Sequence, residues 1–417
     1  MKMKLIFTLA LMGGCFCPAG AQWTLDSCRE KALANYPQVR QYDLIRKSSE
    51  YTLSNAGKAY LPQVSLSGKA SYQTDVTRIP VDIPGVREMN KDQYGLTLDV
   101  SQSLWDGGVT HSKKKIEQAS AYLSKQQLEV ELYALNDRVN QLYFGILLLD
   151  AKREQNKLLQ EELQRNYERV NSLFRNGMAN AADLDAVRVE QLKAIQQETQ
   201  LVSGRTAYVE MLAHLTGQQS TGEVTLVKPE EPLLTSDEIH RPELSFFEAQ
   251  QQLLNIQRES VKVGYMPKFG LFITGGYGRP GLNMLDRDFS PYAIGGIRLS
   301  WNFGSLYTSK NERRLIETSL QNTWVQRETF LFNTEMELSR QQQEIRKNKD
   351  LLEYDDEIIR LRENVKRSAE AKVANGMMTI TDWMEKVTDE SLARQEKIQH
   401  EMEYLLSMYN KKYTTNN

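Results

Sequence analysis

The sequence has little of several features that mark common protein classes. It has 3 cysteines in 417 residues, and two of them, Cys15 and Cys17, lie in the first 21 residues. If those residues are removed as a secretory signal, Cys28 is left alone, and an internal disulfide framework is excluded. Lys and Arg together number 52 and Asp and Glu 54, a formal charge of −2 that excludes a nucleic-acid binder working through bulk positive charge. The mean hydropathy of −0.54 excludes a membrane protein with many spanning helices.

The sequence also lacks the signatures of catalysis. The four histidines, His111, His214, His240 and His400, are scattered without metal-ligand spacing. There is no His-Glu-x-x-His motif, no nucleophile elbow and no phosphate-binding loop. The sequence therefore predicts no enzyme, no metal and no cofactor, and any energy coupling has to come from a partner.

The first 21 residues have the pattern of a secretory signal. Lys2 and Lys4 precede an apolar stretch over 5–12, and Ala19-Gly20-Ala21 is a small-residue cleavage site. The apolar stretch is too short to span a bilayer. The alternative is cleavage before Cys15, which would then carry a lipid.

The rest of the chain contains an internal duplication. Tyr60-Leu61-Pro62 recurs as Tyr265-Met266-Pro267, and Asn176-Gly177-Met178 recurs as Asn375-Gly376-Met377 at a similar offset. We expect a first repeat at 22–217, a linker rich in Pro and Gly at 218–239, a second repeat at 240–412 and a tail at 413–417.

Each repeat contains two segments in which apolar and polar residues alternate. They lie at about 63–75 and 92–104 in the first repeat, and at about 268–279 and 292–303 in the second. A period of two predicts strands with one apolar and one polar face. Their length suits a tilted crossing of a bilayer.

Long helical hairpins follow the strands, at about 110–215 and 307–412, and carry apolar residues with heptad spacing. In the first repeat these are Leu128, Leu132, Leu135, Val139, Leu142, Ile146 and Leu149, and in the second Trp324, Leu331, Leu338, Ile345, Leu352 and Ile359. A period of 3.5 predicts coiled-coil packing against another helix. A helix over 110–175 would be roughly 100 Å long.

Four amphipathic strands cannot close a barrel, because small barrels need about eight. An open sheet edge is not tolerated in lipid, so the pattern implies association of several chains. Aromatic residues near the strand ends are typical of an interfacial girdle: Tyr60, Trp105, Tyr265, Trp301 and Tyr307. The alternative is a soluble periplasmic coiled coil with two hairpins.

At this point the sequence resembles the TolC family of outer-membrane channel subunits. Three segments resemble the family at helix and strand boundaries: Trp23 to Pro37 at the start of the first helix, Tyr60 to Val64 at the entry into a strand, and Leu104 to Gly108 at the exit from a strand. The two tip turns resemble it as well. The first has Arg175 to Gly177 and Asp183 to Ala186, and the second has Asn375-Gly376 and Asp382. The resemblance covers nearly the whole chain after the signal.

The resemblance implies an α+β membrane protein, a homotrimer with a twelve-stranded β-barrel in the outer membrane of a Gram-negative bacterium and a periplasmic α-helical tunnel. It implies as partners outer-membrane lipid, a periplasmic adaptor (membrane fusion protein) and an inner-membrane pump of the RND or ABC type, and no nucleic acid. The implied function is a passive export duct in a tripartite efflux pump. The alternatives are the channel of a type I protein secretion system and a soluble periplasmic adaptor.

The two tip turns are candidate contact sites. A tight turn between helices needs left-handed backbone, which Gly177 and Gly376 allow. By the resemblance, these glycines and their neighbours, Asn176, Met178, Asn375 and Met377, form the tunnel mouth and contact the adaptor.

Asp382 and Glu385 lie three residues apart and share one helix face. The resemblance implies that they ring the pore entrance and favour cations. The other interpretation is an acidic first turn that complements the helix dipole. The family's entrance latch uses a basic residue and a tyrosine, but the matching positions here are Met378 and Val373, so the latch is not expected.

Overall fold

The computed structural model describes residues 22–76, 89–218, 224–234 and 236–416. The expected signal and the possible lipidation site at Cys15 lie outside them. Contacts divide the chain into two compact units. The sheet unit takes residues from 40–130 and 242–332, and the hairpin unit takes residues from 22–39, 131–241 and 333–416. Each unit thus draws on both repeats.

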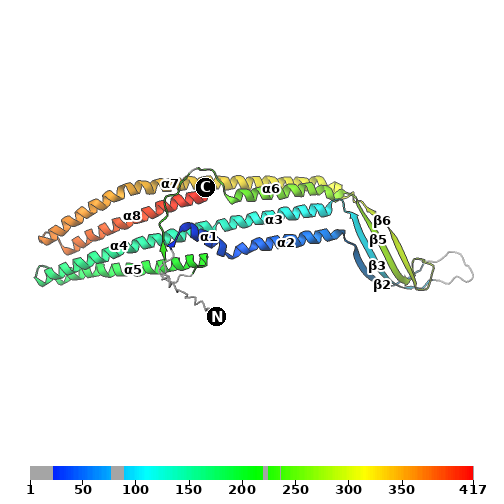
Figure 1. Cartoon of the computed structure of the whole chain (residues 1–417), viewed down its shortest axis with the longest axis horizontal. Helices are drawn as coiled ribbons and strands as arrows, with labels where there is room; N and C mark the ends of the chain where they lie inside the picture. Colours follow the sequence, from blue (N-terminus) through cyan, green and yellow to red (C-terminus); the bar gives the residue numbers. More distant parts are fainter. Residues whose placement is uncertain (1–21, 77–88, 219–223, 235, 417) are drawn as a thin grey trace, which may run out of the picture. The chain divides into compact units, whose positions relative to one another are not determined.

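The sheet unit is built on one antiparallel sheet of four strands (Figure 1). The strands are β2 (Gln63–Tyr72), β3 (Asp92–Trp105), β5 (Lys268–Arg279) and β6 (Ser290–Ser300), in the order β2-β3-β5-β6. The expectation of four strands per chain is confirmed, with bounds within a few residues of the alternating segments. The pairing of β3 with β5 joins the two repeats in one sheet.

The register gives the sheet one apolar and one polar face, because directly paired residues point to the same side. Leu66 lies opposite Leu98, Val100 opposite Ile273 and Leu271 opposite Ile297. These side chains are largely exposed within the chain; Leu66 and Ile297 keep 67% and 73% of their surface accessible. An exposed apolar face of this extent requires a cover that the described residues do not supply.

Helical segments precede the first and follow the second of the two strands that each repeat contributes to this sheet. The sheet unit holds α2 (Gln41–Gly57), α6 (Pro242–Ser260), most of α3 (Val109–Tyr133) and the first part of α7 (Ser305–Ala374). Short 3-10 segments accompany them: η1 (Pro37–Arg40), η2 (Lys58–Tyr60) and η3 (Val261–Tyr265). The expected continuous helix over 110–175 is interrupted at Ala134, which separates α3 from α4. Within the described residues, no helix is sufficiently long and apolar to cross a membrane.

The hairpin unit pairs α4 (Leu135–Arg175) with α5 (Ala181–Thr216), and the second part of α7 with α8 (Ile380–Thr415). Helix α4 contacts both α5 and α8, so the two hairpins pack together (Figure 1). Helix α1 (Leu25–Asn35) lies against α4 and α5. A two-stranded parallel sheet of β1 (Gln22–Trp23) and β4 (Thr225–Leu226) completes the unit.

Tyr143 lies in the apolar core around α1 and connects the linker to the helices by hydrogen bonds. Its hydroxyl lies 2.6 Å from the carbonyl oxygen of Trp23 and 2.7 Å from that of Val227, and the side chain is fully buried. The described part of the expected linker is therefore packed against the helices. Cys28 lies in the same core, and burial raises the pKa of its thiol to about 11.

The heptad line of the first repeat is confirmed as a packing seam, because Leu128, Leu132, Leu135, Val139 and Ile146 are buried. Its other two members, Leu142 and Leu149, are partly buried. The heptad line of the second repeat is not confirmed. Of its members only Ile345 is buried, and Trp324 is half exposed.

The buried line of α7 runs instead through Thr334, Gln341, Asn348 and Asp355, which are all polar. Gln341 donates from Nε2 to Oγ1 of Thr414 at 2.9 Å, and Asp355 lies 2.9 Å from Nδ1 of His400. The prediction was wrong because α7 turns its polar line toward α8 and leaves its apolar line at the margin of that contact.

The Tyr143 hydroxyl generates a stability prediction. In Tyr143→Phe the partly buried carbonyl of Val227 loses its donor, so we expect a loss of about 1 kcal/mol in the free energy of unfolding. The measurement is denaturant unfolding followed by circular dichroism. Tyr208→Phe, on an exposed ring of α5, is the matched control and should change little. If the Tyr143→Phe variant and the wild type unfold at the same denaturant concentration, the hydrogen bond from Tyr143 to Val227 does not stabilise the fold.

Candidate functional site

The tips of the two helical hairpins have the same backbone geometry. Gly177 and Gly376 are left-handed, with φ of 71° and 69°. In both turns the next N–H, that of Met178 or Met377, donates to the carbonyl five residues earlier at 2.8 Å. This is the Schellman arrangement that ends a helix and lets the chain reverse. The repeated Asn-Gly-Met sequence therefore forms one turn twice.

The returning helices begin with side-chain caps at matching positions. Asn180 and Asp183 form a reciprocal capping box at the start of α5. At the start of α8, Thr379 accepts the N–H of Asp382 at 3.1 Å. Such caps satisfy N–H groups that the first helical turn leaves free. The rigid turns hold Met178 and Met377 outward, 67% and 70% exposed, so each tip presents an apolar side chain to a neighbour.

The two acidic candidates differ in their surroundings. Asp382 is exposed and makes no ion pair with any described residue. Glu385 accepts a hydrogen bond from Lys386 at 2.8 Å, and this bond raises the pKa of Lys386. The charge of Glu385 is thus partly compensated within the chain, and the charge of Asp382 is not.

An apolar cluster lies directly behind the tips. It contains Leu163, Val170, Val187, Ala194, Ala369, Ile380, Trp383, Met384 and Val387. Val373 and Met378 pack against it as partly buried residues. The positions that would carry the basic residue and the tyrosine of an entrance latch therefore serve apolar packing here.

Charged side chains that could not be paired from the sequence link the two hairpins next to this apolar cluster, at its end away from the tips. Lys366 of α7 donates to Glu162 of α4 at 2.8 Å and to Glu390 of α8 at 3.2 Å. Glu390 is only 3% exposed and also pairs with Arg394. Burial acts to lower the pKa of Lys366, but the two carboxylates outweigh it and raise that pKa. One ammonium thus ties together three helices.

A second link joins the same hairpins nearer the tips. Arg169 of α4 pairs with Glu370 of α7, and its guanidinium lies 5.8 Å from the ring centre of Trp383. The sequence did contain one signal for this region. Glu390 follows Trp383 and Val387 at helical spacing, so a charge falls on an otherwise apolar stripe and demands a partner.

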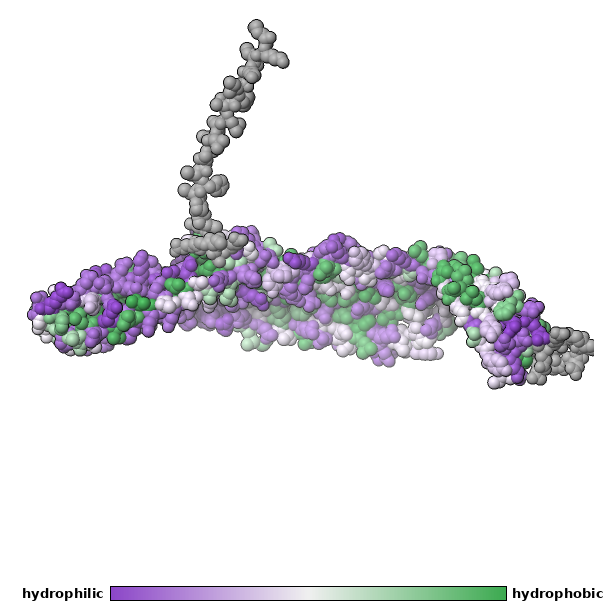
Figure 2. Space-filling model, turned by 90° about the horizontal axis from the view of Figure 1, so that it is seen from below, coloured by the Kyte–Doolittle hydropathy of each residue, from purple (hydrophilic) through white to green (hydrophobic). Residues whose placement is uncertain are grey.

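The aromatic candidates of the sheet unit lie where strands meet helices, all at one end of the sheet. Trp301 donates from its indole N–H to the carbonyl of Tyr265 at 3.0 Å. A β-bulge places Trp105 opposite Phe269, on the apolar face, with ring centres 5.9 Å apart. Tyr307, in the first turn of α7, is 86% exposed. On the face seen in Figure 2, hydrophobic residues gather around this end of the sheet, and hydrophilic ones cover its far end.

Tyr60 has a further, structural contact. Its hydroxyl donates to Asp106 at 2.8 Å, and Asp106 also accepts the N–H groups of Gly108 at 2.9 Å and Thr110 at 2.7 Å. Partial burial acts to raise the pKa of Asp106, but these hydrogen bonds outweigh it and lower the pKa to about 2. Asp106 therefore caps α3 as an ionised group and holds it to the segment before β2.

The Lys366 link generates a prediction. Lys366→Met leaves the buried Glu390 with one cation fewer, and we expect unfolding to require about 2 kcal/mol less. The measurement is guanidinium unfolding of the detergent-solubilised protein. The control is Arg360→Met on the same helix, whose pair with Glu357 is exposed and should contribute nothing measurable. Equal losses in the two variants would show that Lys366 is not a link.

Comparisons with known proteins bear on this geometry. Residues 28–218 match the family model "Outer membrane efflux protein". No curated protein is found as a relative. The fold is shared with solved structures at low identity. The outer membrane protein VceC from Vibrio cholerae is 13% identical with a TM-score of 0.69, over 94% of this chain and 96% of that one.

The CmeC outer membrane channel of Campylobacter jejuni is 14% identical with a TM-score of 0.66, over 94% of this chain and 85% of that one. The MtrE outer membrane channel of Neisseria gonorrhoeae is 13% identical with a TM-score of 0.67, over 94% of this chain and 89% of that one. The family model covers most of the first repeat, and the shared fold covers 94% of the chain. This confirms the expected mostly helical chain with a four-stranded sheet. Over residues 28–218 the chain is similar to the outer membrane efflux protein family, and it shares its fold with solved outer membrane channels.

Proposed function

We propose that three copies of this chain assemble into a passive export duct of the outer membrane, as the outer-membrane component of a tripartite efflux pump. The observation that carries the proposal is the four-stranded sheet. It has an exposed apolar face, and its outer strands β2 and β6 each pair on one side only among the described residues.

Two open edges and one apolar face make the sheet one part of a larger closed sheet. In lipid each unpaired backbone group would cost several kcal/mol, so the edges have to pair with other strands. Four strands are too few to close on themselves, and three copies supply twelve. The strands have 10 to 14 residues, which suits a tilted crossing of the hydrocarbon layer.

The hairpin tips are the proposed contact for a periplasmic adaptor. Their support is the repeated rigid turn at Gly177 and Gly376 and the two exposed methionines, Met178 and Met377, since methionine adapts to varied partner surfaces. The adaptor would connect the duct to an inner-membrane pump of the RND or ABC type, which supplies the energy. A type I secretion duct would share the fold and differ in its pump. A soluble adaptor, the third alternative, would have no use for a sheet with an exposed apolar face.

The experiment that tests the duct is outer-membrane fractionation, detergent extraction and light scattering, followed by conductance in planar bilayers. A conducting outer-membrane trimer is the expected result. A soluble periplasmic monomer or dimer without conductance would refute the proposal and move the chain to the adaptor class.

The pore entrance carries a prediction of its own. Asp382, the uncompensated carboxylate of the second tip, should favour cations when three copies surround the axis. Asp382→Asn should therefore lower the cation preference measured from reversal potentials.

Asp183→Asn is the matched control for Asp382→Asn. The carboxylate of Asp183 is already bound to the backbone N–H of Asn180, so this variant should change the preference less. An unchanged ion preference in the double variant Asp382→Asn and Glu385→Gln would rule out the acidic entrance.

A further inference from the structure

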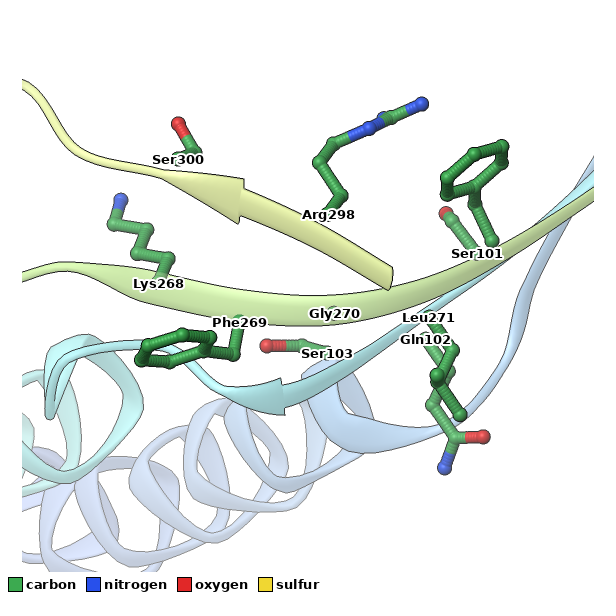
Figure 3. A pocket seen from close by; sticks show the side chains of 10 residues that line it. Ser101, Gln102, Ser103, Lys268, Phe269, Gly270, Leu271, Arg298 and Ser300 are labelled. Carbon is green, nitrogen blue, oxygen red and sulfur yellow. The ribbon is translucent and has the colours of Figure 1, made fainter. Parts of the chain in front are cut away.

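A hollow on the polar face of the sheet has the residues of an anion site. It has a volume of about 180 Å³ and lies at the helix end of β3, β5 and β6. Two cationic side chains, Lys268 and Arg298, line it together with the hydroxyls of Ser101, Ser103 and Ser300. Figure 3 shows Lys268, Arg298, Ser300 and Ser101 on one side of the sheet and Leu271 and Gln102 on the other.

The strand register brings these groups together. Arg298 of β6 and Ser103 of β3 both lie opposite Gly270 of β5, and Lys268 lies opposite Ser300. Lys268 and Arg298 are thus diagonal neighbours, with backbones about 7 Å apart. Residues at these distances can reach one small ligand from two sides.

Gly270 makes the hollow. A Cβ atom at this position would lie 3.0 Å from the carbonyl oxygen of Gln102, so a side chain here would crowd the backbone of β3. The floor between the two cations is therefore bare backbone, and a ligand can approach it closely.

The charges of the hollow are not compensated nearby. Within the described part of the chain, neither Lys268 nor Arg298 forms an ion pair with a carboxylate. Asp99 on the same face accepts a hydrogen bond from Thr274 at 2.5 Å and lies four residues from Ser103, about 13 Å along the strand. The site therefore has an excess of positive charge.

Phe272 orients the arginine. The guanidinium carbon of Arg298 lies 4.9 Å from the centre of the half-buried Phe272 ring. This contact holds the planar group over the ring and leaves its N–H edge free to donate. A held guanidinium binds an oxyanion with less loss of side-chain entropy than a free one.

We propose that this hollow binds the oxyanion group of an exported molecule, such as a carboxylate, phosphate or sulfate. The proposal rests on the proposed function, because the duct turns the polar face of the sheet toward the lumen. Arg298 supplies paired donors, Lys268 a point charge and the serines neutral hydroxyl donors, which together match an oxyanion. Three copies form a ring of three such sites.

The test uses the purified full-length assembly in planar bilayers, with inorganic phosphate as the probe. Phosphate should block the wild-type conductance in a saturable manner. In the double variant Lys268→Gln and Arg298→Gln, the half-blocking concentration should rise at least tenfold. Lys69→Gln removes one positive charge from the same face of the sheet on β2, away from the hollow, where the double variant removes two. It should shift the half-blocking concentration less than twofold.

Arg298→Lys separates geometry from charge. It keeps the charge and loses the paired donors, so we expect a rise of at least threefold in the half-blocking concentration. If Lys69→Gln and the double variant raise the half-blocking concentration equally, the block depends on the total charge of the face and the proposal is overturned. A half-blocking concentration that neither variant changes would also overturn it.

Calorimetric titration of the detergent-solubilised protein with phosphate makes the outcome independent of conductance. If the protein conducts but wild type and double variant bind phosphate equally, the anion site fails and the duct stands. If the protein does not conduct but the double variant binds at least tenfold more weakly, the duct fails and the site stands.

Discussion

Backbone hydrogen bonding at the sheet edges is the constraint on which the architecture depends. A strand that faces lipid has no water to satisfy its N–H and C=O groups, and β2 and β6 each have one side unpaired among the described residues. The same sheet exposes an apolar face that no described helix of its own unit covers. Both features are liabilities in a monomer, and the proposed association of identical sheets would resolve both.

The hairpin unit meets a different requirement, because its helices have to stay aligned while much of their surface is polar. Apolar clusters supply the packing near α1 and behind the tips. Between them, α7 faces α8 with a line of Thr, Gln, Asn and Asp side chains. Buried polar groups of this kind need specific partners, so they favour one register over its neighbours. The Lys366 contacts with Glu162 and Glu390 act in the same way between hairpins.

The sequence predicted the elements whose cause is local. Alternation revealed the four strands, and Asn-Gly-Met marked both tip turns, because left-handed backbone favours glycine wherever the fold places it. The first heptad line was predicted because its apolar residues face a partner in the same chain. The second failed because spacing shows which residues share a face of α7 and does not show which face meets α8.

The candidate sites show the same difference between features with a local cause and contacts between distant segments. The four amphipathic strands and the tip glycines could be predicted from the sequence, since each depends on neighbours within a few positions. The duplication was visible as motifs repeated along the chain, and Asp382 was a candidate by the family resemblance. Only the tertiary structure decided that Lys366 reaches Glu162, 204 positions away. It also decided that Tyr60 binds Asp106, and that Lys268 and Arg298 flank a bare glycine on one face. The physical reason is that these contacts depend on strand register and helix rotation, which are set by packing between segments distant in the chain.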